Sequence, residues 1–287
     1  MIDLDAQRRF YAEEMEVVAN LRTPALVDAL ATIPREQFLA PGPWTFRSEM
    51  DFMGGGPRRT PDADPRRLYH NIVVAIDLER QLYNGAPGIL GACIDALGIT
   101  PGAHVLHVGC GLGYYTAILA HLTGPAGRVV AIDVDEALAT GARRNLAAWP
   151  WIEVRHGDGT GAGDARFDAI LVNAGVTHPH DSWLAALESG GRLILPLTCS
   201  FPQMGPIGKG FFVLFTDRGE PERLDARVAG MVAIYSAVGL RDAALNERLG
   251  KAFLRSPFPP IKHLRRDAHE EGPACWLHGG SFCLSTA

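Results

Sequence analysis

The stretch His104-Val105-Leu106-His107-Val108-Gly109-Cys110-Gly111-Leu112-Gly113-Tyr114-Tyr115-Thr116-Ala117-Ile118-Leu119-Ala120 decides the fold of this chain. Its first five residues have the apolar character of a buried strand, and a helical pattern begins after the glycines. Gly109, Gly111 and Gly113 let the backbone take positive φ and let a ligand approach without meeting a Cβ atom. Strand, glycine turn and helix together predict a nucleotide-binding βα unit, in which the helix N-terminus offers unpaired N–H groups.

The glycine spacing narrows the kind of nucleotide. A dinucleotide site requires G-x-G-x-x-G, whose third glycine allows the helix to pack closely on the strand. Here the spacing is G-x-G-x-G, and the bulky Tyr114 and Tyr115 follow, which opposes a nicotinamide-dependent oxidoreductase. The loop resembles that of S-adenosylmethionine-dependent methyltransferases, which bind a ligand without phosphate. For a glycine loop taken alone, a tight turn with no ligand is the alternative.

Composition points to an intracellular globular protein. The chain has 287 residues, a net charge of −5 and no strongly basic half, so a nucleic-acid-binding surface is not indicated. The N-terminus lacks the basic and apolar regions of a signal peptide, and no apolar run approaches the ~20 residues that span a bilayer. The five cysteines are scattered and form no C-x-x-C pair, so they indicate neither a zinc site nor a disulfide framework. We therefore expect a cytoplasmic protein.

The order of the expected elements is typical of a doubly wound α/β protein. Helices are expected over 3–20 and 24–33, a long loop rich in Pro, Gly and Arg over 40–67, and a strand-like run over 69–78. Strands alternating with helices then predict a Rossmann-like, mainly parallel sheet with right-handed crossovers. The expected strands are 104–108, 128–133, 152–156, 167–173 and 192–196, and the expected helices are 87–98, 115–122, 136–148 and 183–188.

After Pro196 the pattern changes to strands without long helices between them, which predicts an antiparallel C-terminal addition. Strands are expected over 210–215 and 227–235 with a turn near Gly219-Glu220-Pro221, then a helix over 241–253 and an edge strand over 276–284. We expect three parts: an N-terminal helical segment and arm (1–78), a cofactor-binding core (79–240) and a C-terminal extension (241–287).

Polar residues stand at the carboxyl ends of successive expected strands, where ligands bind in open α/β sheets. Asp133 ends the second strand and can accept hydrogen bonds from both ribose hydroxyls. Asp158, in Gly157-Asp158-Gly159, ends the third and can accept from an adenine amino group. Asn173 ends the fourth. An Asp after a strand is often only a helix N-cap, but the joint order with the glycine loop favours a cofactor site.

The central part of the chain resembles a known family. From Pro101 to Leu197 it is similar to protein-L-isoaspartate O-methyltransferases, and Ile33-Pro34-Arg35-Glu36-Gln37-Phe38 looks like the opening element of that family. The resemblance is carried by the segments 105–117, Ala142-Arg143-Arg144-Asn145-Leu146, His156-Gly157-Asp158-Gly159, 167–175 and Gly190-Gly191-Arg192-Leu193-Ile194-Leu195-Pro196.

The resemblance implies S-adenosylmethionine as cofactor and methyl transfer to the α-carboxylate of an isoaspartyl residue. The family carries a Gly-Gln-Thr-Ile-Ser-Gln-Pro-like segment before the glycine loop. Here the segment is Arg80-Gln81-Leu82-Tyr83-Asn84-Gly85-Ala86-Pro87, one residue longer and without Ser or Thr. We hypothesise that Asn84 supplies an amide in place of the hydroxyl. The residues expected to bind the cofactor are Tyr83, Gly85, Gly109, Cys110, Gly111, Gly113, Asp133, Val134, Asp158 and Gly159.

The expected catalytic residues are Asn84, Asn173 and His178. A carboxylate acceptor needs no general base, whereas a hydroxyl or amine acceptor usually needs one, and His178 or His180 could serve. Exposed loop histidines are the alternative, and a metal site from His178, His180 and Asp181 is less favoured. We expect no metal, and His107 reads as a core residue. An O- or N-methyltransferase of a small molecule or modified peptide, and a non-catalytic cofactor-binding protein, remain alternatives.

Overall fold

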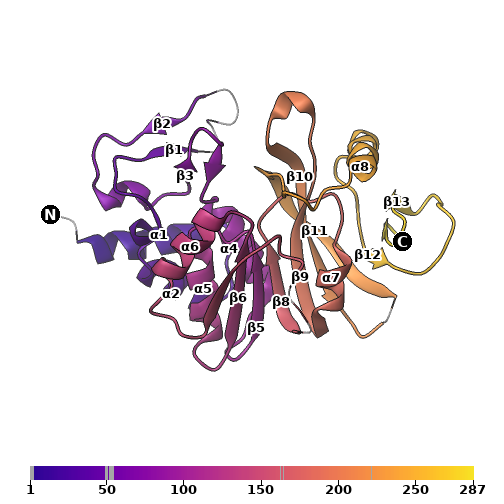
Figure 1. Ribbon diagram of the computed structural model, residues 1–287, viewed down its shortest axis with the longest axis horizontal. Helices are drawn as coiled ribbons and strands as arrows, with labels where there is room; N and C mark the ends of the chain where they lie inside the picture. Colours follow the sequence, from indigo (N-terminus) through magenta and orange to yellow (C-terminus); the bar gives the residue numbers. More distant parts are fainter. Residues whose placement is uncertain (1–2, 49–50, 52–54, 162, 164, 221) are drawn as a thin grey trace. The chain divides into compact units, whose positions relative to one another are not determined.

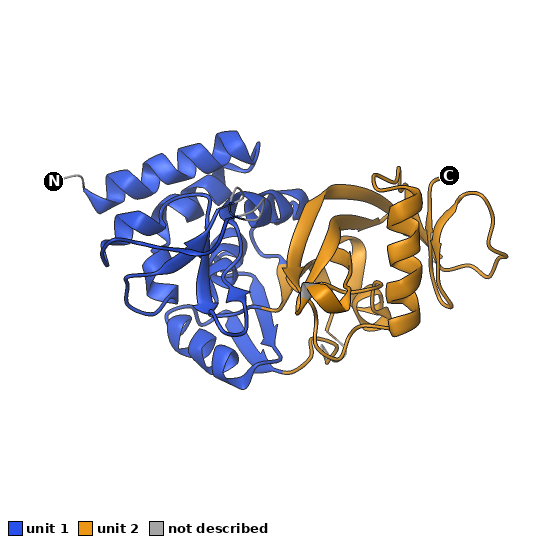
Figure 2. Cartoon of the chain, turned by 90° about the horizontal axis from the view of Figure 1, so that it is seen from above, with its two compact units in different colours: residues 1–103, 110–156 blue, residues 104–109, 157–287 orange. Residues whose placement is uncertain are grey.

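The computed structural model describes residues 3–48, 51, 55–161, 163, 165–220 and 222–287. The chain forms two compact units, coloured separately in Figure 2. Unit 1 comprises Met1–Ala103 and Cys110–His156, and unit 2 comprises His104–Gly109 and Gly157–Ala287. The chain thus passes from one unit to the other inside the glycine loop. The expected boundaries near residues 78 and 240 stay predictions of the sequence.

The N-terminal helices of unit 1 are confirmed. Helix α1 covers Leu4–Val18 and α2 covers Pro24–Thr32, with Pro24 in the first turn. Thr23 occupies the N-cap of α2, but its side chain makes no capping bond. The carboxylate of Asp95, in α4 (Pro87–Leu97), instead accepts from the Thr23 N–H at 2.9 Å. The short 3₁₀ helix η1 follows at Arg35–Phe38.

Residues 40–67 are not one long loop, so that prediction is wrong. They contain β1 (Thr45–Arg47), β2 (Arg58–Arg59) and part of the 3₁₀ helix η2 (Pro65–Leu68). With β3 (Val73–Asp77) and β4 (Leu82–Tyr83) these strands form an antiparallel sheet of order β2-β1-β3-β4 (Figure 1). Phe46 lies opposite Val74, far along the chain, and such long-range pairing leaves little signal in a segment rich in Pro and Gly.

The rest of unit 1 follows the expected alternation. Helix α5 (Tyr114–Thr123), β6 (Arg128–Asp133), α6 (Glu136–Asn145) and β7 (Ile152–His156) occur in that order, and β6 pairs with β7 in parallel. Tyr114 and Tyr115 are buried, as expected for packing residues. Because β6 and β7 are parallel, their carboxyl ends meet at one edge of the sheet.

Unit 2 continues the parallel pattern and then becomes antiparallel. β5 (His104–Val108), β8 (Phe167–Val172) and β9 (Leu187–Cys199) pair in parallel, and β9, β10 (Ile207–Asp217) and β11 (Arg223–Tyr235) pair antiparallel. Within unit 2 the strand order is β13-β14-β12-β11-β10-β9-β8-β5. The antiparallel addition is confirmed. The predicted turn includes Pro221, which lies outside the described residues.

Several predicted bounds in unit 2 differ from the structure, and β9, β10 and β11 all begin before the predicted strands 192–196, 210–215 and 227–235. Helix α7 covers Asp181–Ala185 instead of 183–188, because β9 already begins at Leu187. Helix α8 covers Ala243–Arg255, starting after the N-cap Asp242. The single edge strand expected over 276–284 is wrong: β13 (Cys275–His278) and β14 (Cys283–Ser285) form a hairpin, since the chain turns at Gly279. β14 then pairs with β12 (His263–Arg265).

His107 confirms the expectation of a core residue. It is fully buried in β5, and burial lowers the pKa of its imidazole to about 3, so it stays neutral. Among the described residues, none of the helices combines the length and apolar character needed to cross a bilayer.

Candidate functional site

The glycine loop has the backbone conformation that its sequence predicts. Gly109, Gly111 and Gly113 have φ of 78°, 56° and 96°, the left-handed region that other residues rarely adopt. A Cβ on Gly109 would lie 3.1 Å from the backbone oxygen of Asn173, and one on Gly113 would lie 2.8 Å from Leu146 Cδ1. Gly109 and Gly113 therefore allow the loop to pack closely against Asn173 and Leu146, and Gly113 also forms the N-cap of α5.

Asp133 is bound to the loop in unit 1. It ends β6, is 7% exposed, and accepts from the Gly111 N–H at 2.8 Å and from the Asp135 N–H at 3.0 Å, with a different oxygen for each. Desolvation raises the pKa of Asp133 above its ordinary value, while the two backbone N–H donors act in the opposite direction. Each carboxylate oxygen still has a lone pair left, so Asp133 can accept from ligand hydroxyls.

The side-chain amide of Asn84 is oriented by two donors. Its Oδ1 accepts from the Val74 N–H at 2.9 Å and from Arg35 Nη2 at 3.1 Å. Its Nδ2 is buried, and no group in the described part of the chain accepts from it. Because a buried donor without a partner is costly, this N–H₂ group marks a place where a ligand acceptor would be stabilised.

Arg35 is a site-building residue that the sequence interpretation did not single out. Its side chain is fully buried, and its guanidinium donates to the carbonyl oxygens of Leu68 and Ile72, at 2.7 Å each, and to Asn84. It thus joins η1 to the segments around β3 and β4. The sequence carried little signal for this role, because Arg35 stands beside the polar residues Glu36 and Gln37.

Four further predicted cofactor residues lie in unit 1. Tyr83 pairs with Ala75 in the β3–β4 hairpin. Gly85 has a φ of 80°, and its carbonyl accepts from the Tyr115 hydroxyl at 3.2 Å. Cys110 is buried, and its N–H donates to the Ile132 carbonyl at 3.2 Å. The side chain of Val134, which directly follows β6, is 44% exposed.

Asp158 and Gly159 belong to unit 2 and lie in the turn that follows the end of β7 at His156. Asp158 Oδ1 accepts from the N–H and the hydroxyl of Thr160, at 2.9 and 2.7 Å, and these bonds lower the pKa of Asp158. Gly159 has a φ of 85°, and a Cβ there would lie 2.4 Å from Val108 Cγ1. Its carbonyl also accepts from Trp183 Nε1 at 2.8 Å. The turn is thus fixed, and Asp158 is ionised.

Asn173 and His178 also lie in unit 2. The Asn173 N–H continues the parallel ladder by donating to the Val108 carbonyl at 2.8 Å. Nδ1 of His178 lies 2.9 Å from the hydroxyl of Thr177, which itself accepts from the Asp242 N–H. Burial, and secondarily the charge of His180, lower the pKa of His178. This imidazole is neutral near pH 7, and in the tautomer that carries its proton on Nδ1 the Nε2 atom can accept a proton.

The three residues considered for a metal site do not share a common centre. His180 caps α7 by accepting from the Ser182 N–H through Nδ1, and Asp181 is exposed and lies 3.8 Å from Arg266. In contrast, two of the cysteines that seemed scattered in sequence, Cys275 and Cys283, lie close together with His269 and His278. Their spacing along the chain gave no expectation of this group.

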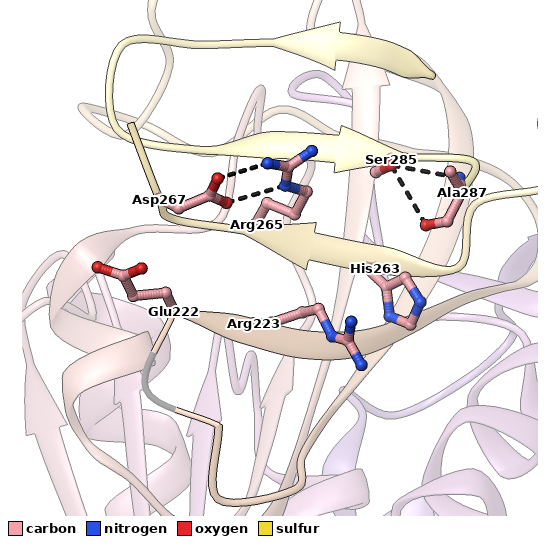
Figure 3. A pocket seen from close by; sticks show the side chains of 7 residues that line it. All are labelled: Glu222, Arg223, His263, Arg265, Asp267, Ser285 and Ala287. Atoms are coloured by element: carbon pink, nitrogen blue, oxygen red, sulfur yellow. Dashed lines mark hydrogen bonds and ion pairs between the residues drawn. The ribbon is translucent and has the colours of Figure 1, made fainter. Parts of the chain in front are cut away.

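A pocket of about 410 Å³ in unit 2 contains none of the predicted site residues (Figure 3). Charged side chains from β11, β12 and their flanks, including Arg223, Arg265 and Asp267, line it. It is a feature of the C-terminal addition, and the candidate methyl-transfer residues lie elsewhere in the sequence.

Comparison with known proteins agrees with this fold. Residues 59–205 match the family model described as Protein-L-isoaspartate(D-aspartate) O-methyltransferase (PCMT). The chain is 33% identical over 232 residues to a Protein-L-isoaspartate O-methyltransferase of Methylorubrum populi, covering 80% of this chain and 93% of the relative. A relative of the same name from Methanopyrus kandleri is 28% identical over 66% of this chain and 76% of its own.

Solved structures show the same fold. A protein-L-isoaspartate O-methyltransferase superposes with a TM-score of 0.61 and 20% identity, covering 85% of this chain and 68% of its own. A candidate enzyme of that kind from Plasmodium falciparum, in complex with S-adenosyl-L-homocysteine, superposes with a TM-score of 0.58 and 15% identity over 80% of this chain and 97% of its own. The extent of the family match and the identity to the Methylorubrum relative show that this chain is a methyltransferase of the protein-L-isoaspartate O-methyltransferase (PCMT) family.

Proposed function

We propose that this protein transfers a methyl group from S-adenosylmethionine to the α-carboxylate of an isoaspartyl residue in a peptide or protein. The observation that carries the proposal is the orientation of Asn84. Its Oδ1 is occupied by Arg35 and Val74, so the group left for a ligand is the Nδ2 donor. A donor suits a carboxylate oxygen, and an amide cannot act as a general base at neutral pH.

The residues of the chain fit the cofactor. Asp133 would accept from the ribose hydroxyls, since its oxygens are each held by one N–H and keep further acceptor capacity. The ionised Asp158 would accept from the adenine amino group. The glycines of the loop 109–113 would let the cofactor approach the backbone, because they have no Cβ and each takes a positive φ. Tyr83, Gly85, Cys110, Val134 and Gly159 are proposed as further contacts.

For this reaction the protein has to align the acceptor with the methyl group, and no proton transfer is required. When bound, S-adenosylmethionine supplies an electrophilic methyl group on a sulfonium sulfur. An acceptor carboxylate is already ionised at neutral pH, so no residue has to remove a proton. We propose that Asn84 holds one carboxylate oxygen through Nδ2 and that Asn173 adds a polar contact. Positioning of this kind can contribute a large part of the rate enhancement.

A second candidate acceptor, a hydroxyl or amine of a small molecule or modified peptide, is favoured by His178. Its lowered pKa and its contact with Thr177 leave a neutral ring with Nε2 available, as a general base requires. The acceptor that reacts therefore decides whether His178 has a chemical role.

Methyl transfer from radiolabelled S-adenosylmethionine tests the proposal. The substrates are an isoaspartyl peptide and the same peptide with an ordinary aspartate. We expect base-labile methyl ester on the isoaspartyl peptide and none above background on the matched peptide. Calorimetric binding of S-adenosylhomocysteine without labelling of either peptide would contradict the acceptor assignment, and binding of NAD in place of S-adenosylhomocysteine would contradict the cofactor assignment.

A further inference from the structure

The C-terminal extension brings together four side chains that bind metals in proteins. His269 lies in the loop between β12 and β13, Cys275 and His278 are the ends of β13, and Cys283 begins β14. One ligand atom from each lies within 4.8 Å of all the others, and both cysteines are buried. The set contains two thiols, two imidazoles and no carboxylate.

The ligand atoms, all within 4.8 Å of one another, lie close to the spacing of a tetrahedral centre. With zinc bonds of ≈ 2.3 Å to sulfur and ≈ 2.0–2.1 Å to nitrogen, neighbouring ligand atoms of a tetrahedron lie about 3.3–3.8 Å apart. Cys275 Sγ lies 3.6 Å from His269 Nε2. The two imidazole rings meet edge to face, with their centroids 4.9 Å apart. Small shifts of side chains would therefore complete the coordination.

The surroundings orient the ligands as in metal sites. Nδ1 of His269 lies 2.9 Å from the Asp267 carbonyl, so it carries the proton and leaves Nε2 with a lone pair directed at Cys275. Asp267 is itself held by a two-pronged ion pair with Arg265 (Figure 3). The Gly272 N–H donates to Cys275 Sγ at 3.3 Å, a contact that stabilises a thiolate.

An unpartnered buried atom points to a missing ligand. Nδ1 of His278 is buried, and no group in the described part of the chain bonds to it. A buried polar atom without a partner is costly. Coordination of a metal by Nδ1 would remove that cost, and coordination by Nε2 would re-orient the ring so that Nδ1 could reach a partner.

We propose that His269, Cys275, His278 and Cys283 bind one Zn²⁺ in a closed Cys₂His₂ site. Thiolate and imidazole ligands in a tetrahedron select zinc, and four protein ligands leave no open position for catalysis. The role is structural: the metal joins the 266–274 loop, through His269, to the β13–β14 hairpin at the end of the unit 2 sheet. A disulfide between Cys275 and Cys283 is the competing use of these thiols, but it would give no role to the two histidines.

Metal analysis of the full chain, purified under reducing conditions and supplied with one equivalent of Zn²⁺ before desalting, tests the site. We expect about one zinc per chain. In the Cys275→Ser/Cys283→Ser variant we expect less than about 0.1 zinc per chain, whereas Cys199→Ser, a control that alters a buried cysteine outside the group, retains the full amount.

Cobalt substitution in the unmodified chain decides the matter if the double variant does not fold. We expect the visible bands of tetrahedral Co²⁺ together with a thiolate charge-transfer band, both lost on adding Zn²⁺. The proposal would be overturned if the reduced unmodified chain bound no zinc, or if a folded double variant kept the full amount. It would also be overturned if Cys275 and Cys283 formed a disulfide and the chain still bound no zinc after that disulfide was reduced. None of these measurements depends on methyl transfer.

Discussion

The loop 109–113 and the segment 80–87 both follow a strand, but different parts of the sequence fix their shapes. The loop is encoded locally: each of its glycines takes a positive φ, and the residues on either side form the strand and the helix. The segment is fixed from a distance, by Arg35 and by the Val74 N–H, which hold Asn84. The loop proposed to bind the methyl donor can thus keep its shape while the segment proposed to bind the acceptor changes.

The largest expected effect comes from removing the distant support of the segment. We expect Arg35→Met to lower the free energy of unfolding by about 3–5 kcal/mol, because the carbonyls of Leu68 and Ile72 would lose their donors in a buried place. Chemical denaturation measures this. Arg128→Met is the matched control, since that guanidinium is 54% exposed and pairs with Glu153 at the surface; its cost should stay within about 1 kcal/mol. Equal costs would show that Arg35 does not build the segment.

A change at Asp133 probes the donor side. We expect Asp133→Asn to weaken S-adenosylhomocysteine binding by about 10- to 100-fold, because one acceptor oxygen is replaced by an N–H₂ group that opposes the Gly111 or the Asp135 N–H. Calorimetry gives the affinity. Asp28→Asn, at an exposed carboxylate of α2, serves as control. Unchanged affinity in the Asp133 variant would remove Asp133 from the cofactor site.

The affinity for S-adenosylhomocysteine should fall as the pH is lowered. The pKa of Asp133 is raised in the folded protein by desolvation, so the carboxylate takes up a proton at a higher pH than an ordinary aspartate. The folded state then binds that proton more readily than the unfolded chain, and the contribution of this group to stability grows as pH falls. Binding needs the ionised form, so affinity should fall up to tenfold per pH unit below that pKa.

The Asp133→Asn variant provides the control for the titration. Its affinity should change less over the same pH range, because it has no group to protonate at that position. A titration that is equally steep in both proteins would assign the effect to another residue.

A glycine pair separates backbone strain from ligand access. Gly109→Ala and Gly124→Ala both place a side chain at a positive φ, at a cost of about 1–3 kcal/mol each. A Cβ at Gly109 would also lie 3.1 Å from the Asn173 carbonyl oxygen, whereas none of the described atoms lies within 4 Å of one at Gly124. We expect about tenfold weaker S-adenosylhomocysteine binding for the first variant and unchanged binding for the second. Equal affinities would mean that strain alone governs the loop.

The smallest effect is expected at His178. For an isoaspartyl acceptor, His178→Gln should change kcat by less than about twofold, because no proton has to be removed. A loss of about 10²-fold or more would show that His178 takes part in methylation of the carboxylate, and would contradict a reaction that needs no general base. Steady-state kinetics on the isoaspartyl peptide distinguishes the two outcomes.

Features that depend on residues close together in the chain could be predicted from the sequence. The parallel strands, the glycine conformations and the burial of His107 follow from residues close together in the chain. The β1–β3 pairing and the role of Arg35 depend on contacts between residues distant in the chain, and short-range patterns carry little signal for these. Spacing alone hid the metal-binding group, because its cysteines follow the pattern C-x₂-H-x₄-C instead of C-x-x-C.

Asn84→Asp tests the central claim most directly, because it keeps the oxygen that accepts from Arg35 and Val74 and replaces only the Nδ2 donor. Its control is Asn71→Asp, at an amide whose Oδ1 accepts from the Gly88 N–H. The measurement is kcat/KM for the isoaspartyl peptide beside the dissociation constant for S-adenosylhomocysteine. We predict a fall in kcat/KM of about 10²-fold, from the lost donor and like-charge repulsion, with the dissociation constant changed less than about twofold. An unchanged kcat/KM, or an equal loss in both quantities, would contradict the account.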